Sequence, residues 1–194
     1  MTDKNNQRTG GQLLVDCLLN QGAEIGYCVP GESYLGVLDA LYDIPDELKL
    51  IICRQEGSVA FMAEAYGSLT GKPGLGFVTR GPGATNASIG VHTGFQDSTP
   101  MIVLIGQVAA YQADREAFQE IDYRRMFGQM AKWVAEINET SRVPEYMSRA
   151  FQTAAAGRPG PVVLSLPEDM LSTKADAPET RPVTIAKPGV SESD

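Results

Sequence analysis

The chain has 194 residues, the size of one folded domain with a tail, and such a domain can fold without a metal or a disulfide. Its 16 basic and 24 acidic side chains give a net charge of −8 without any basic run, which excludes a nucleic-acid-binding surface. The longest purely apolar run, residues 101–105, is far shorter than the roughly 20 residues that span a bilayer, so no membrane segment is expected.

The N-terminus and the cysteines indicate the compartment. Residues 1–11 are polar and lack the apolar segment of a signal peptide. Cys17, Cys28 and Cys53 are odd in number and lack metal-ligand spacing, so we expect reduced thiols. Both observations predict a cytoplasmic protein.

Six short apolar runs are predicted strands, and several are apolar at consecutive positions, which is typical of strands covered by helices on both faces. They are residues 25–29, 50–53, 75–79, 101–105, 132–137 and 162–166. Helical periodicity lies between them, over residues 12–21, 33–42, 56–69, 83–94 and 145–156. The alternation predicts a doubly wound, three-layer α/β/α domain with a mostly parallel six-stranded sheet.

The predicted domain covers residues 1–171. From Ser172 the periodicity stops, and a segment with three prolines and mixed charges follows. Residues 172–194 are therefore predicted to be an extended linker to another domain.

Ligands of doubly wound sheets bind outside the carboxyl ends of the strands, so the residues that follow each strand are the candidates for a site. These are Pro30, Gly31, Glu32 and Ser33 after the first strand, then residues 54–57, 80–86 and 106–107, with residues 117–120 further on.

Local sequence leaves structural and functional interpretations open here. Backbone N–H groups at Gly81-Pro82-Gly83 could hold an anion, but a tight turn with proline at the first helical position explains the same residues. Glu56 could be a catalytic carboxylate or a helix-start charge that favours the helix dipole. His92, the only histidine, has no neighbouring histidine or cysteine, which argues against a Ser-His-Asp or Cys-His site.

Six stretches carry a more specific pattern in a fixed order. They are Gly26–Gly31; Arg54–Gly57 with Met62–Tyr66 and Thr70–Gly74; Val78–Asn86; Asp97–Pro100; Ala117–Glu120; and Gly157–Val162. Over residues 8–170 the chain resembles the N-terminal, pyrimidine-binding domain of thiamine diphosphate (ThDP) enzymes, most closely the acetolactate synthase-like branch.

The resemblance implies roles for individual residues. Glu56 would be the catalytic acid that protonates the pyrimidine N1′, so that the cofactor's own amino group can act as a base. Gln119 would be a second catalytic residue near the reacting carbonyl. The remaining cofactor-binding residues would be Pro30, Gly31, Glu32 and Ser33 along the pyrimidine, with Thr79, Pro82 and Asn86 beside it.

Two residues depart from the family pattern. Glu32 and Arg80 stand where the synthases usually have small residues. Arg80 is expected to be either a substrate anion site or a surface charge. Lys132 stands where the family often has lysine, but the resemblance assigns it no role.

The family holds the diphosphate and Mg²⁺ on a separate domain with a Gly-Asp-Gly motif, and this motif does not occur in the sequence. We therefore expect no metal ligand in this chain, and Mg²⁺ on a diphosphate-binding domain in cis or in a partner chain. The family's cofactor lies between subunits, which implies a homodimer or higher oligomer. The chain alone is expected to be inactive.

Three interpretations follow. The chain is the pyrimidine-binding part of an acetolactate synthase-like enzyme of 2-oxo acid decarboxylation and carboligation. Alternatively, it is the small subunit of a split ThDP decarboxylase. The third interpretation is a non-catalytic α/β ligand-binding module, in which Glu56 is only a helix-start charge.

Overall fold

The computed structural model describes residues 7–186 and contains one six-stranded sheet in the order β3-β2-β4-β5-β7-β6. Every neighbouring pair of strands in it is parallel. The strands are β2 (Ile25–Cys28), β3 (Lys49–Ile52), β4 (Gly74–Val78), β5 (Met101–Gln107), β6 (Trp133–Glu136) and β7 (Pro161–Pro167). The predicted three-layer, doubly wound sheet is confirmed.

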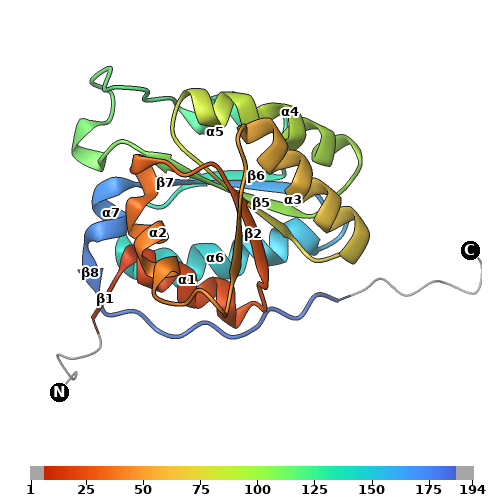
Figure 1. The fold of residues 1–194 in the computed structure, drawn as a ribbon, viewed down its shortest axis with the longest axis horizontal. Helices are drawn as coiled ribbons and strands as arrows, with labels where there is room; N and C mark the ends of the chain where they lie inside the picture. Colours follow the sequence, from red (N-terminus) through yellow and green to blue (C-terminus); the bar gives the residue numbers. More distant parts are fainter. Residues whose placement is uncertain (1–6, 187–194) are drawn as a thin grey trace, which may run out of the picture.

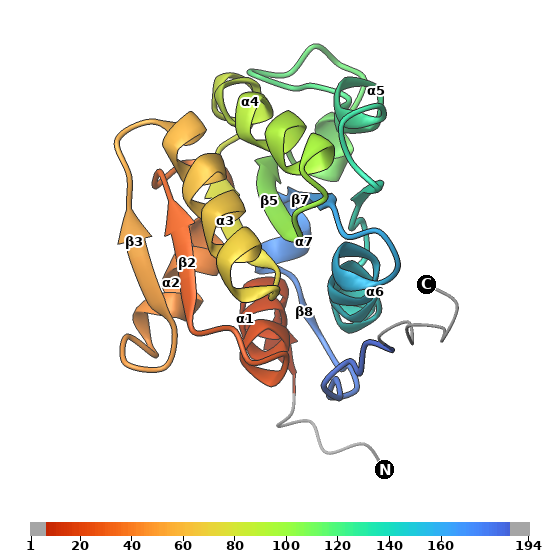
Figure 2. The same ribbon diagram turned by 90° about the vertical axis from the view of Figure 1, so that its right-hand side faces the viewer.

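Helices cover both faces of the sheet (Figures 1 and 2). One face carries α1 (Gly10–Asn20), α2 (Leu35–Tyr42), α6 (Val143–Ala155) and α7 (Glu168–Ser172), and the other carries α3 (Glu56–Thr70), α4 (Pro82–Gln96) and α5 (Tyr123–Phe127). The central strands β4, β5 and β7 are buried at every position, which explains why they are apolar except at Gln107 and Ser165. None of these helices, within residues 7–186, is long and apolar enough to cross a membrane.

The helix predicted over residues 33–42 is shorter in the structure. The 3₁₀ turn η1 (Glu32–Tyr34) comes first, and α2 begins only at Leu35. Tyr34 is buried, and its hydroxyl donates to the carbonyl of Val29. Tyr34 has a φ of −138° and so lies outside α-helical geometry, which helical periodicity cannot reveal.

The starts of α3 and α4 place the predicted site residues. The Gln55 side chain caps α3 by accepting a hydrogen bond from the Ser58 N–H at 3.1 Å, so Glu56 is the first helical residue. Gly81 has a φ of +57° and makes the turn before α4, which begins with Pro82. Both helix starts therefore lie at the carboxyl edge of the sheet.

The end of the described chain packs back on the domain. A short ribbon outside the sheet joins β1 (Arg8–Thr9) to β8 (Lys174–Ala175) in antiparallel pairing. The segment then runs along α1, where the Gln21 side chain bonds the carbonyl of Arg181 and the N–H of Val183, both at 2.8 Å (Figure 1). The first part of the predicted linker 172–194 is thus extended but docked, and residues 187–194 lie outside the described residues.

Candidate active site at the carboxyl edge of the sheet

The structure brings Glu56 and Asn86 together. Glu56 begins α3 after β3, and Asn86 lies in the first turns of α4 after β4. The Asn86 side-chain amide donates to Glu56 Oε2 at 2.9 Å, and Glu56 is half-buried. The sequence predicted both residues for the site but not this contact between them.

The other oxygen of Glu56 faces a glycine. A Cβ at Gly83 would lie 3.3 Å from Glu56 Oε1 and 2.8 Å from Thr79 Cγ2. The missing side chain therefore leaves room for the carboxyl group beside Thr79. Within residues 7–186 no protein group hydrogen-bonds Oε1, so this oxygen is available to a ligand.

The loop after β2 lies against the end of β4. A Cβ at Gly31 would lie 2.6 Å from Thr79 Cβ, so this close approach requires glycine. Ser33 is fully buried and its hydroxyl bonds Thr79 Oγ1 at 2.8 Å. Ser33 thus supports the loop from inside, whereas Pro30 is exposed at its surface.

Arg80 is a buried side chain held by two glutamates. It is 7% exposed, so it is not a surface charge. Its two terminal nitrogens donate to carboxylate oxygens of Glu32 and Glu168, each at 2.8 Å. The expectation of a surface charge is therefore wrong, and the expectation of a substrate anion site stays a prediction.

Gln119 lies beside the turn that precedes α4. A Cβ at Gly81 would lie 2.7 Å from Gln119 Cβ, so the two residues are in contact. The N–H of Gly81 donates to the Tyr123 hydroxyl at 2.9 Å, and burial raises the pKa of Tyr123 to about 12. The hydroxyl therefore stays uncharged at neutral pH and fixes the turn on which Gln119 rests.

Sequence reasoning missed the residues that organise the Gln119 loop. The Glu120 carboxylate accepts the backbone N–H groups of Asp114 at 2.7 Å and Ala117 at 3.1 Å. Glu120 belongs to the stretch Ala117–Glu120 that carried the resemblance, so its position was visible. Its partners were not, because they are backbone groups of an irregular loop.

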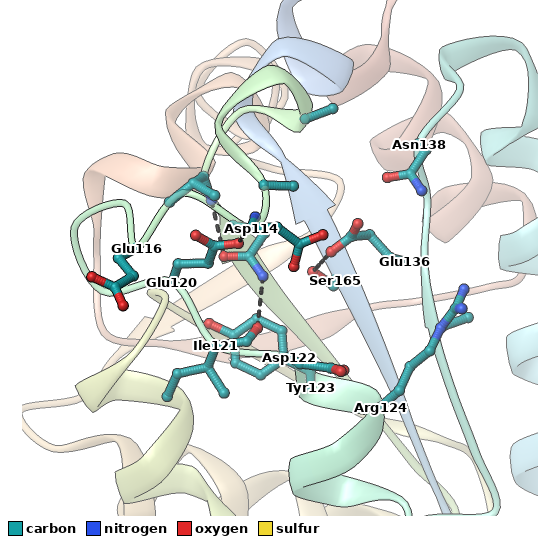
Figure 3. Close-up of a pocket in the computed structure, with 15 residues that line it drawn as sticks. Asp114, Glu116, Glu120, Ile121, Asp122, Tyr123, Arg124, Glu136, Asn138 and Ser165 are labelled. Carbon is teal, nitrogen blue, oxygen red and sulfur yellow. Dashed lines mark hydrogen bonds between the residues drawn. The ribbon is translucent and has the colours of Figure 1, made fainter.

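A second feature of this edge is an acidic cavity of about 600 Å³ at the carboxyl ends of β5, β6 and β7 (Figure 3). Glu136, which accepts from Ser165 Oγ at 3.0 Å, and Glu120 are among its lining residues. None of the predicted cofactor residues lines the cavity. Over residues 7–186, no group of three or more His, Cys, Asp or Glu side chains could hold a metal ion.

Comparison with known proteins shows the family of the chain. Residues 8–126 match the family model described as thiamine pyrophosphate enzyme, N-terminal TPP binding domain. The acetolactate synthase of Bacillus subtilis (strain 168) is 35% identical over 185 residues, which cover 95% of this chain and 32% of the relative. Escherichia coli (strain K12) acetolactate synthase isozyme 3 large subunit is 35% identical over 178 residues, 92% of this chain and 31% of the relative.

A third relative is the probable acetolactate synthase large subunit of Methanocaldococcus jannaschii, which is 35% identical over 190 residues, 92% of this chain and 32% of the relative. The chain spans about a third of the length of these relatives. The family match defines the chain as a cofactor-binding domain, and its polar residues lie at the carboxyl edge, where parallel α/β sheets bind ligands. More narrowly, the chain belongs to the thiamine pyrophosphate enzyme family as an N-terminal, TPP-binding domain of the acetolactate synthase-like kind. Thiamine pyrophosphate and ThDP are the same cofactor.

Proposed function

We propose that this domain binds the pyrimidine end of ThDP and contributes to decarboxylation and carboligation of a 2-oxo acid. The observation that carries the proposal is the geometry of Glu56. One carboxylate oxygen is held by Asn86 at 2.9 Å, and the other faces the open side of Gly83 with no hydrogen-bond partner among residues 7–186. A carboxyl group arranged in this way can exchange a proton with a ring nitrogen.

The residues present fit one end of the cofactor only. The pyrimidine needs an acid and closely approaching backbone, which Glu56 and the glycines at positions 31 and 83 supply. The diphosphate needs a cation, and the Gly-Asp-Gly motif with which the family holds it does not occur in the sequence. This supports our proposal that the diphosphate and Mg²⁺ are held by another domain, in cis or in a partner chain.

When bound, ThDP supplies a carbon nucleophile for the carbonyl of the 2-oxo acid. Glu56 Oε1 would hold the proton shared with the pyrimidine N1′, and Asn86 would fix the direction of the carboxyl group. Pro30, Gly31 and Thr79 would border the ring, with Glu32 and Ser33 behind them and Pro82 at the start of α4. Gln119 would donate from its amide to the reacting carbonyl.

The assembly and compartment follow from the same proposal. A cofactor bound at one open edge needs a second surface to exclude water, which a homodimer or higher oligomer would provide. The three cysteines are free, with Cys17 and Cys28 buried, which supports a reducing, cytoplasmic compartment.

Glu56→Gln in the complete protein tests the proposal. Gln keeps the shape of Glu but cannot deliver the acid proton, so ThDP-dependent CO₂ release from a panel of 2-oxo acids should fall by at least about 100-fold. Glu47→Gln is the matched control, because Glu47 is exposed in a loop between α2 and β3. Unchanged turnover in Glu56→Gln, with wild-type circular dichroism, would favour the non-catalytic module.

Calorimetry on this chain alone tests the need for a second part. With ThDP and Mg²⁺ we expect little heat, because the charge-assisted contacts to the diphosphate are supplied elsewhere. Tight binding to the isolated chain would contradict this expectation. Co-purification of a separate diphosphate-binding chain from the native source would instead support the split-subunit alternative.

A further inference from the structure

We infer that Arg80 is a positioning residue that holds the loop carrying Gln119 against the sheet. The ion pairs of Arg80 with Glu32 and Glu168 anchor the Arg80 side chain to the rest of the carboxyl edge. The inference rests on the proposed function only for what Gln119 does there. The contacts themselves are independent of any cofactor.

The loop between β5 and α5 needs such a support. It spans residues 108–122, contains one short 3₁₀ turn (η2, Ala110–Gln112), and is exposed over most of its middle part. Asp114, Glu116 and Gln119 all have positive φ values, of 61°, 52° and 65°. Non-glycine residues adopt this conformation only where surrounding contacts hold them.

Arg80 supplies the contact from outside the loop. Its Nε donates to the carbonyl of Phe118 at 3.0 Å, and its guanidinium lies 5.9 Å from the centre of the Phe118 ring. Within the described part of the chain, no other side chain from outside the loop hydrogen-bonds residues 113–119. The residue that follows Phe118 is Gln119, so the bond fixes the backbone immediately before it.

The two terminal nitrogens of the guanidinium anchor the Arg80 side chain. Nη1 bonds Glu168 at the start of α7, and Nη2 bonds Glu32 in η1. The side chain of Arg80 is 9% exposed, whereas those of Glu32 and Glu168 are 69% and 41% exposed. All three guanidinium nitrogens thus have acceptors, which a buried cation requires.

The backbone of Arg80 joins the same unit to the cofactor side. Its N–H donates to Ser33 Oγ at 3.3 Å, and Ser33 Oγ bonds Thr79 at 2.8 Å. Arg80 therefore connects the turn beside Glu56 and Thr79 to the loop that bears Gln119. The departures at positions 32 and 80 are explained together, because Glu32 and Arg80 bind each other.

Amide hydrogen exchange on the full chain, followed by mass spectrometry, tests the inference. Arg80→Met keeps most of the side-chain length but removes every donor, so amides of residues 117–121 should exchange at least 10-fold faster. Amides of β4 and β5 should exchange as in the wild type. Unchanged exchange in residues 117–121, or equal acceleration throughout the chain, would overturn the positioning role.

Arg80→Lys separates positioning from charge compensation. Lysine keeps the positive charge between Glu32 and Glu168 but lacks the planar fork that also reaches the Phe118 carbonyl. We expect amide exchange in residues 117–121 to stay at least 10-fold faster than in the wild type. The midpoint of urea unfolding of Arg80→Lys should lie closer to the wild-type value than that of Arg80→Met. Wild-type exchange in this variant would show that charge alone matters and would overturn the inference.

Glu32→Gln is the matched control. The substitution weakens the bond between Arg80 Nη2 and residue 32 and leaves the Nε bond to the Phe118 carbonyl, so amide exchange in residues 117–121 should change less than 3-fold. A 10-fold increase would contradict the assignment of the Phe118 bond as the holding contact. If these exchange results hold while Glu56→Gln leaves turnover intact, the proposed function fails and the loop support stands.

Discussion

At the scale of single residues, missing side chains set the spacing of the candidate site. Gly31, Gly83 and Gly106 each lie where a Cβ would meet a neighbour of the site. Gly106 in β5 is the tightest of them, since its Cβ would fall 2.1 Å from Ser33 Oγ and 2.6 Å from the Ser33 carbonyl oxygen. Ser33 is fully buried and cannot move away freely.

We therefore expect Gly106→Ala to lower the free energy of unfolding by about 1 to 3 kcal/mol. Gly76→Ala on the neighbouring strand is the control, because its Cβ would lie 3.1 Å from the nearest atom, a side-chain methyl of Val59. Urea unfolding followed by circular dichroism measures both. Equal losses in the two variants would show that Ser33 gives way and that Gly106 is not a fixed contact.

Two buried thiols predict a dependence of stability on pH. Burial raises the pKa of Cys17 and of Cys28 from 9.0 to about 11 each. As pH rises past 9, thiols of the unfolded chain lose protons while those of the folded chain keep them. Folding is then penalised, so this stability is fully present below about pH 8.5 and is lost as pH approaches 11.

By pH 10 the loss should be about 1 kcal/mol for each thiol, measured by urea unfolding between pH 7 and pH 10. Replacing both Cys17 and Cys28 with alanine should flatten this part of the profile, although the variant is less stable at pH 7. A profile of the same slope in the double variant would assign the effect to other groups.

At the scale of elements, Lys132 acquires a role that the sequence did not assign. Its ammonium donates to the carbonyls of Thr153 and Ala156 at the end of α6. The last carbonyls of a helix lack partners within it, and a cation there also opposes the negative end of the helix dipole. Lys132 therefore caps α6 and lies outside the candidate site.

Lys132→Met should lower the free energy of unfolding by about 1 kcal/mol, because methionine keeps the aliphatic packing but not the donor. Lys72→Met is the control, because the Lys72 ammonium, within the described part of the chain, makes only an exposed ion pair with Glu24 at 3.4 Å, which contributes little. Thermal unfolding compares the two. A stability unchanged within about 0.3 kcal/mol in Lys132→Met would contradict the capping role.

The elements that could be predicted are those whose pattern is local. The buried strands β4, β5 and β7 are visible in the sequence as apolar runs, and Gly81 followed by Pro82 marks the start of α4. Glu56 was found because its position at the end of a strand is a property of sequence order. What local pattern could not show are contacts between distant residues, such as Arg80 with Glu168, which are 88 positions apart.

The same limit explains the segment after Ser172. It has no periodicity of its own, and over residues 173–186 it forms no helix and only a two-residue strand. Its order comes from α1, whose residues lie about 160 positions earlier in the chain. The sequence of such a segment predicts a linker, whereas in the structure part of it is packed against α1.

At the scale of the whole molecule, this docked segment bears on where the domain ends. Thr173 accepts the N–H of Gly10 at 3.1 Å, β8 pairs with β1, and Ala177 is buried. The segment therefore closes the face of the domain formed by α1 and α7. If it belongs to the folded unit, the domain extends beyond the predicted boundary at residue 171.

A chain that ends at Ser172 should be less stable than the full chain by about 2 to 4 kcal/mol, from lost apolar burial and several hydrogen bonds. Amides at the start of α1 should exchange faster, because the Gly10 N–H loses its acceptor. A chain that ends at residue 186 keeps every described contact and should match the full chain. Equal urea midpoints for all three chains would restore the boundary at residue 171 and make the docked segment a linker in the ordinary sense.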